Sequence, residues 1–216
     1  MKKLRNTIIL LTLCLIIAVV PFGVCYSVSA DESGITADYE VMRLANDTEL
    51  STNLINNMGA AGNVSEVTMK NHKGVSGNVM RFITEAGASS SMFQTFSSPK
   101  AGTYILSGWS KAQNVIRGIE NEYYSYSLLA SLVFTDGTSK DYSAIFSYGT
   151  HDWEYRKISF TANKPVSSLS VMVFLRAPAS GTAYFDEISL KCADESTELA
   201  TFNDLPVKVL KKATGE

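Results

Sequence analysis

Nine short runs of Val, Ile, Phe, Tyr, Ser and Thr follow one another between residues 64 and 190, separated by Gly, Asn, Asp and Pro. Runs of this composition predict β-strands, and the region lacks the 3.6-residue apolar period of helices. Many short strands joined by turns favour two packed antiparallel sheets. We therefore expect residues 51–192 to form an all-β, two-sheet antiparallel sandwich. The expected strands are 64–70, 79–84, 91–96, 103–113, 126–134, 139–146, 153–161, 168–176 and 182–190.

The clearest local unit is a hairpin around Asp136 and Gly137. Alternate residues from Tyr126 to Phe134 are apolar, which gives that strand one face for a core and one for polar side chains. Asp followed by Gly tolerates the positive backbone dihedral angles of a tight turn. We expect residues 126–134 to pair antiparallel with residues 139–146.

The first thirty residues have the pattern of a cleaved secretory signal peptide. Three cations, at Lys2, Lys3 and Arg5, precede an apolar run over 7–20, and small residues end the segment at Ala30. The alternative is a membrane anchor, but the run is shorter than the roughly 20 residues that a spanning helix needs. We expect cleavage before Asp31, no stable membrane insertion afterwards, and a protein that is secreted or held at the cell surface.

Charge and cysteine content indicate which partners and which covalent cross-links the remaining chain can have. Removing the first 30 of 216 residues leaves 186, with 16 Lys and Arg against 21 Asp and Glu. No basic cluster suits a phosphate backbone, so nucleic acid is not an expected partner. Cys192 would be the single thiol, which excludes an internal disulfide. Residues 31–50 should be a polar spacer and residues 193–216 a linker-like tail, because neither segment has a sustained apolar period. We expect the protein to be a monomer.

Signals of catalysis are sparse in the sequence. His72 is expected to be a solvated turn residue, and His151 with Asp152 is expected to hydrogen-bond its own loop; neither histidine lies in a catalytic or zinc motif. The adjacent carboxylates Asp186 and Glu187 should point to opposite faces of a strand, so they cannot flank one glycosidic bond as an acid and base. We expect no enzymatic activity.

Aromatic side chains are the richer signal. Sugar rings stack on aromatic planes, while their hydroxyls need polar partners, and this is the usual composition of a small-ligand site. Tyr123 and Tyr124 lie in a polar stretch and should be exposed. The predicted ligand-binding residues are Trp109, Tyr123, Tyr124 and Tyr148, and core packing is the alternative role for each of them.

Asp186 lies within an apolar strand, where an unpaired buried carboxylate would cost a few kcal/mol. A Ca²⁺ ion would offset that cost, and a side chain that points into water would avoid it. Phe185 and Ile188 can share the core face only if a β-bulge lies beside Asp186.

Five segments in order carry a resemblance to a known family. They are Asn53–Asn57, Gly74–Phe82, Gly102–Lys111, Gly149–Trp153 and Gly181–Leu190. Together they resemble the jelly-roll carbohydrate-binding modules of secreted bacterial hydrolases and of large cell-wall repeat proteins.

The resemblance implies a jelly-roll sandwich, binding of a polysaccharide or cell-wall glycan, and a structural Ca²⁺ ion near the last strand. We place that ion at Asp186, beside the loops of Asn57 and Asn78. One departure concerns the metal: Met58 and Gly59 stand where the family has a Phe-Glu pair, so an acidic ligand is absent.

Three functions therefore remain open. The first is a secreted, non-catalytic carbohydrate-binding module that binds a glycan by aromatic stacking. The second is a structural or interaction sandwich of a cell-surface protein with no sugar site, because a sandwich alone does not dictate function. The third is a small polysaccharide-degrading enzyme, which would need converging acid and base groups.

Overall fold

A computed structural model describes residues 24–29, 38–44, 50–118, 124–193, 199–202 and 205–213. Within these ranges the regular structure is β-strand, and none of them contains a helix. The chain divides into two compact units, residues 1–44 with 209–216, and residues 45–208. The fold therefore agrees with the all-β class predicted from the sequence.

Strands also occur outside the predicted sandwich, in segments that we expected to be a signal peptide, a spacer and a linker-like tail. β1 (Val24–Ser29) pairs antiparallel with β2 (Asp38–Leu44), and β13 (Leu199–Phe202) pairs antiparallel with β14 (Leu205–Ala213). The expected signal peptide, apart from β1, lies outside the described residues. Across the described ranges we found no helix with the length and apolarity of a membrane span.

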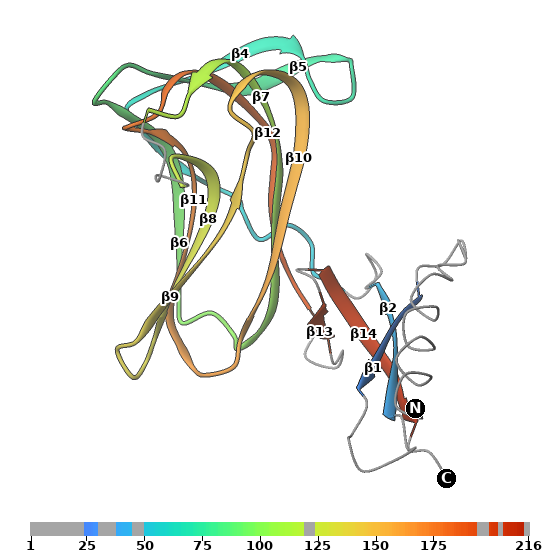
Figure 1. The fold of residues 1–216 in the computed structure, drawn as a ribbon. Helices are drawn as coiled ribbons and strands as arrows, with labels where there is room; N and C mark the ends of the chain where they lie inside the picture. The colour runs from blue at the N-terminus through green and yellow to red at the C-terminus, as the bar shows by residue number, and fades with distance from the viewer. Residues whose placement is uncertain are drawn as a thin grey trace, which may run out of the picture. The chain divides into compact units, whose positions relative to one another are not determined.

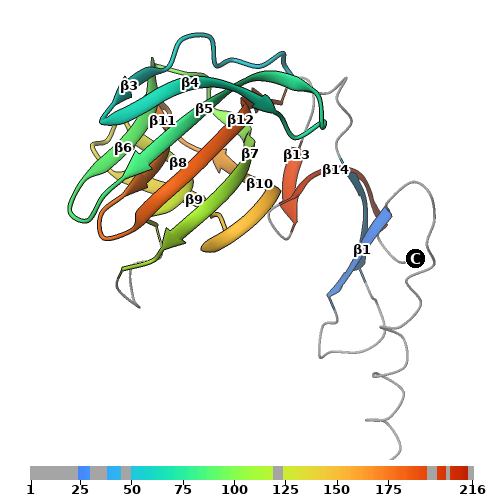
Figure 2. The ribbon, with the colours of Figure 1, turned by 90° about the horizontal axis from the view of Figure 1, so that it is seen from above.

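The sandwich consists of two five-stranded antiparallel sheets that face each other (Figures 1 and 2). We call the first the β7 sheet; its order is β10 (Gly149–Ala162), β7 (Gly102–Ile116), β12 (Ser180–Cys192), β5 (Ser76–Thr84) and β4 (Asn63–Lys70). We call the second the β11 sheet; its order is β3 (Gly59–Ala61), β6 (Ser89–Ser97), β11 (Val166–Arg176), β8 (Tyr126–Phe134) and β9 (Ser139–Ile145).

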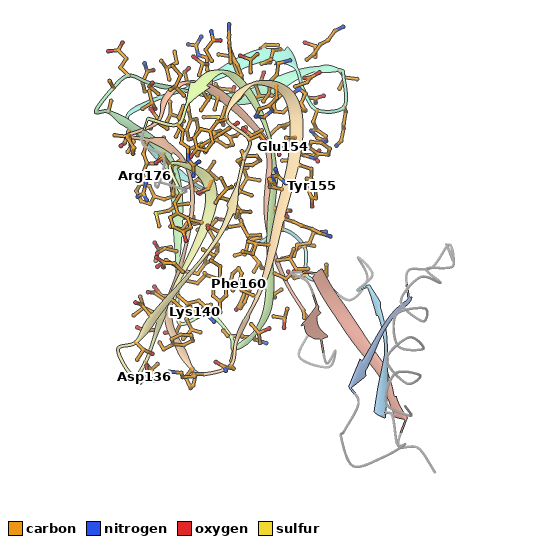
Figure 3. All side chains as sticks on the ribbon, viewed as in Figure 1. Asp136, Lys140, Glu154, Tyr155, Phe160 and Arg176 are labelled. Carbon is orange, nitrogen blue, oxygen red and sulfur yellow. The ribbon has the colours of Figure 1, made fainter. Side chains whose placement is uncertain are left out.

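The core lies between the two sheets and is built by the two-residue alternation of the strands. Leu128, Ala130 and Leu132 of β8 are fully buried, whereas Leu129 and Ser131 between them are partly exposed. Figure 3 shows Phe160 of β10 in the space between the sheets. The alternation therefore sets which side chains remain on the two outward faces. Large fully buried side chains include Tyr126, Phe82, Phe146, Phe185, Leu106, Leu169, Leu175 and Leu190.

All nine predicted strands are present, and the predicted hairpin is confirmed. β8 pairs antiparallel with β9, and Gly137 has a φ of 80° in the turn between them. The sandwich has one more strand than expected, β3, which is only three residues long. Its sequence of Gly and Ala has no apolar alternation, so no pattern could have predicted it.

The predicted β-bulge in the last strand of the sandwich is also confirmed. The register of β12 against β7 shifts between Asp186 and Ser189, and Glu187 has a φ of 45°. The shift allows Phe185 to be buried while Ile188 packs against the same core. Because a bulge changes the parity of the strand, it also re-aims the acidic side chains beside it.

Candidate functional site: the outward face of the β11 sheet

The outward face of the β11 sheet carries apolar side chains at its centre. Leu129 of β8 lies opposite Met172 of β11, which in turn lies opposite Phe93 of β6. Leu129 and Met172 are partly exposed, and Phe93 is exposed. Three neighbouring strands therefore form an apolar strip on a surface that faces away from the core.

A pocket of about 430 Å³ lies on this face. Leu129 and Met172 of the strip contribute its apolar side, and hydroxyl groups, a carboxylate, a guanidinium and a phenol complete its lining. The pocket thus combines an apolar surface with a few convergent polar groups, as ligand sites do. The polar lining residues are Tyr124, Ser131, Asp141, Ser143 and Arg176.

Tyr124 is half exposed, at 50%, and lies two residues before the start of β8. The Ser127 hydroxyl donates a hydrogen bond to the Tyr124 carbonyl oxygen at 3.1 Å, which fixes the backbone that carries the ring. The sequence predicted Tyr124 as an exposed ligand-binding residue, and the structure places it at the pocket. Its predicted neighbour Tyr123 lies outside the described residues.

Arg176 of β11 lines the same pocket as Tyr124. Its guanidinium carbon is 4.4 Å from the ring centroid of Phe174, a cation–π distance, and Phe174 is only 2% exposed. The backbone N–H of Arg176 donates to the carbonyl oxygen of Ser125 at 2.9 Å. These contacts hold the side chain and its strand beside Tyr124.

Trp109 lies on the outward face of the other sheet. It is paired across the strands with Tyr155 of β10, and the two rings are 5.1 Å apart. The His72 ring stacks on Trp109 at 4.7 Å, so part of the indole is used in packing. Figure 3 shows Tyr155 and Arg176 on opposite sides of the sandwich. The structure therefore does not bring Trp109 together with Tyr124.

A second pocket, of about 340 Å³, lies beside Trp109 and Tyr155. Its polar lining includes Asn53, Ser107 and Glu187. This pocket is an alternative ligand site to the one on the β11 sheet. Substitution of Tyr155 tests which of the two pockets binds a ligand.

Tyr148, the fourth predicted ligand-binding residue, has a packing role. It is partly buried, and its ring lies edge-on to Tyr126, with centroids 6.1 Å apart. The Arg117 guanidinium lies 5.6 Å from the Tyr148 centroid. Tyr148 is not among the residues that line the pocket at Tyr124.

His72 is not the solvated turn residue that the sequence suggested. Its side chain is 7% exposed, and its Nδ1 lies 2.6 Å from Oδ2 of Asp186. Its Nε2 lies 3.3 Å from Oε2 of Glu187. The expectation that Asp186 and Glu187 point to opposite faces was wrong, because the bulge turns both carboxylates toward the same imidazole.

The residues predicted for calcium converge, but the carboxylate among them is already paired. Asp186, Asn57 and Asn78 all line one pocket of about 330 Å³, and their oxygens are the ligand type that Ca²⁺ prefers. However, Oδ2 of Asp186 contacts His72, and Oδ1 accepts the backbone N–H of Glu187 at 3.0 Å. In the described part of the chain, no three His, Cys, Asp or Glu side chains are grouped to hold a metal. Calcium does not fit this arrangement as it stands.

The loop interpretation of His151 and Asp152 is confirmed. The ring nitrogens of His151 lie 2.7 Å and 2.8 Å from the carbonyl oxygens of Asp152 and Ser147. Lys111 donates to the Asp152 carboxylate at 2.9 Å, and this hydrogen bond lowers the pKa of Asp152. The contacts tie the start of β10 to the preceding turn, and they occupy both ring nitrogens of His151.

Six residues that sequence reasoning did not select belong to the candidate site: Leu129, Ser131, Asp141, Ser143, Met172 and Arg176. Each lies on a strand that was correctly predicted, on the face opposite the core. The alternation of apolar and polar residues shows that these side chains point away from the core. It does not show which strands are neighbours, so the sequence could not show that these residues share a pocket.

No protein-family model matches this chain. A part of it is similar to curated bacterial proteins. The tRNA nuclease WapA of Bacillus subtilis strain 168 is 33% identical over 85 residues, which are 39% of this chain and 4% of that protein. The tRNA3(Ser)-specific nuclease WapA of Bacillus spizizenii matches to the same extent. The chain thus spans only a small fraction of the relatives that it matches.

Several solved structures with a similar fold are carbohydrate-binding modules. A family 16 carbohydrate-binding module aligns with 59% of this chain and 84% of its own, at 20% identity and a TM-score of 0.42. The CBM22-1 xylan-binding domain of Paenibacillus barcinonensis Xyn10C aligns with 63% and 86%, at 12% identity and a TM-score of 0.43. TmCBM61, solved with β-1,4-galactotriose, aligns with 62% and 86%, at 16% identity and a TM-score of 0.39.

Proposed function

We propose that the sandwich of residues 50–193 is a non-catalytic module that binds a glycan on the outward face of the β11 sheet. One observation carries the proposal: the half-exposed ring of Tyr124 lies at a pocket lined by both apolar and hydrogen-bonding side chains. The pocket volume of about 430 Å³ falls in the range of roughly 300–1,000 Å³ that is typical of small-ligand sites.

The chemistry of the lining suits a sugar. One face of a pyranose ring is apolar and stacks on an aromatic plane such as that of Tyr124. Met172 and Leu129 extend the apolar surface, and Ser131 and Ser143 supply hydroxyls that both donate and accept hydrogen bonds. The Asp141 carboxylate accepts hydrogen bonds from sugar hydroxyls at the far side of the pocket.

Binding without hydrolysis is part of the proposal, and the acidic groups at the pocket support it. Cleavage of a glycosidic bond ordinarily uses two carboxyl groups that flank it. Asp141 is the one carboxylate among the described residues that line this pocket. The nuclease activity named for the curated relatives is not part of this proposal, because the similar region is 4% of each of them.

Secretion is the second part of the proposal, and it rests on the sequence of residues 1–30. A module outside the cell would meet polysaccharides of the medium or of a cell wall. We propose that the mature protein begins at Asp31 and acts as a monomer in that location.

The proposed function can be tested with the full chain on a glycan array, followed by calorimetry with the best-bound glycan. We expect Tyr124→Ala to weaken binding at least about tenfold, equivalent to about 1.4 kcal/mol. Tyr155→Ala is the matched control, because Tyr155 is 44% exposed and lies on the opposite sheet. Loss of binding in Tyr155→Ala alone would move the site to the β7 sheet. Failure to bind any glycan would favour the structural or interaction module.

A further inference from the structure

Arg176 carries a charge that the described residues do not balance with a carboxylate. Some other cations of the sandwich are paired: Arg156 contacts Glu154, and Lys164 contacts Asp136. The guanidinium of Arg176 instead contacts the ring of Phe174, and no described Asp or Glu forms an ion pair with it. Arg176 is also partly buried, in a pocket, where an unpaired cation is less well hydrated than at an open surface.

The carboxylate of the same pocket lies too far along the sheet to be its partner. Asp141 lies opposite Ser131, which lies opposite Ser170 of β11. Arg176 is six residues beyond Ser170 on this strand, a backbone separation of about 20 Å at roughly 3.3 Å per residue. The pocket is therefore polarised, with a cation at the Tyr124 end and an anion at the other end.

The guanidinium is also held in one place before any ligand arrives. Stacking on the buried Phe174 ring restricts the Arg176 side chain. A planar guanidinium donates two parallel hydrogen bonds to a carboxylate, which is stronger and more directional than a contact with a neutral hydroxyl. A guanidinium that no described carboxylate compensates, next to an exposed aromatic ring, suits a sugar that bears a carboxylate.

We propose that the glycan is acidic, with the carboxylate of a uronic acid on Arg176 and the ring of that sugar on Tyr124. The inference rests on the proposed function and names the substrate class of the same site. Hydroxyls of an adjoining sugar bind toward Asp141, where a second carboxylate would be repelled.

The ligand arm of the test uses matched sugars with the full chain. Calorimetry compares polygalacturonate, alginate and hyaluronan with the neutral polymers galactan and xylan. The bound uronate is then compared with the same polymer after its carboxyl groups have been methyl-esterified. We expect at least one uronate polymer to bind, esterification to weaken binding at least about tenfold, and added salt to weaken it severalfold.

The protein arm compares Arg176→Gln and Arg176→Lys with Lys157→Gln. Lys157 is an exposed cation on β10 of the other sheet, so its removal changes net charge by the same amount without touching the pocket. We expect Arg176→Gln to abolish most of the preference for the charged polymer over its ester, Arg176→Lys to retain part of it, and Lys157→Gln to retain all of it. Melting curves identify a variant that fails to fold. In that case the comparison of the uronate polymer with its methyl ester tests the acidic-glycan proposal without the variants.

The outcomes separate the two proposals. Binding of neutral polymers alone, or binding of a uronate that neither esterification nor Arg176→Gln weakens, would overturn the acidic substrate and leave the glycan-binding function intact. Absence of binding to every polymer, charged or neutral, would overturn the glycan-binding function itself.

Discussion

His72 Nδ1 lies 2.6 Å from Asp186 Oδ2, and this contact joins the loop between β4 and β5 to the last strand of the sandwich, 114 residues further along the chain. Both side chains are nearly buried, at 7% and 12% exposure. The backbone N–H of His72 also donates to the same oxygen at 3.3 Å. The pair holds the hairpin against β12 in a chain whose described residues contain no disulfide.

Removing this carboxylate should destabilise the sandwich. We expect Asp186→Ala to lower the free energy of unfolding by roughly 1.5–3 kcal/mol, the usual range for a hydrogen bond to a charged group. Urea denaturation measures the change. Glu187→Gln is the control, because Glu187 is 50% exposed and exposed ion pairs contribute about 0–1 kcal/mol. Equal losses in the two variants would contradict the assigned role of Asp186.

Calcium should have little effect on stability, because His72 and a backbone N–H already satisfy Asp186. We expect melting temperatures in millimolar calcium and in chelator to agree within about 1 °C. A structural ion at a hundredfold excess over Kd would add about 2.7 kcal/mol, or several degrees at roughly 2–4 °C per kcal/mol. A calcium-dependent rise that Asp186→Ala removes would restore the metal site predicted from the family resemblance.

Two buried tyrosines should make the protein sensitive to alkali. Burial raises the pKa of Tyr104 to about 12 and raises the pKa of Tyr126 well above its ordinary value. Unfolded tyrosine has a pKa of about 10, so the folded state holds these protons more tightly. Their contribution to stability is complete below about pH 10 and is lost as the pH rises toward the folded pKa.

The measurement is a series of melting temperatures from neutral to alkaline pH. We expect a steep fall above about pH 10 that Tyr104→Phe makes shallower. Tyr155→Phe, at an exposed position, should leave the fall unchanged. A fall of the same steepness in Tyr104→Phe would show that other groups cause the alkaline loss.

Processing of the first thirty residues is a prediction from the sequence alone. When the chain is expressed in a secreting bacterial host, we expect the intact mass of the exported protein to correspond to residues 31–216. We expect cleavage after Ala30 because the small residues that end there form the pattern that signal peptidase recognises. Recovery of residues 1–216 in the membrane fraction would favour the uncleaved anchor.

The strands could be predicted because their signal is local. The alternation in residues 126–134 and the Asp136–Gly137 turn needed only neighbouring residues, and the hairpin formed as expected. The bulge at Asp186 could be predicted for the same reason, since Phe185 and Ile188 could not otherwise share a face.

The partnerships within the sites needed the tertiary structure. Sequence reasoning selected Trp109 and Tyr124 as candidate ligand-binding residues, but it could not say which sheet each would join. Trp109 lies on β7, whereas Tyr124 lies at a pocket of the β11 sheet. Local sequence predicts an exposed His72, and the side chain is buried because a strand 114 residues away brings Asp186 to it. Arg176 belongs to a pocket because strands distant in sequence adjoin there.

The sequence by itself therefore determined the strands and the inward or outward direction of most of their side chains, because both follow from a two-residue period that neighbouring residues set. Only the packing of the sheets decided which side chains meet. Contacts such as those of Tyr124 with its pocket depend on strand order and register, and these are properties of segments far apart in the chain.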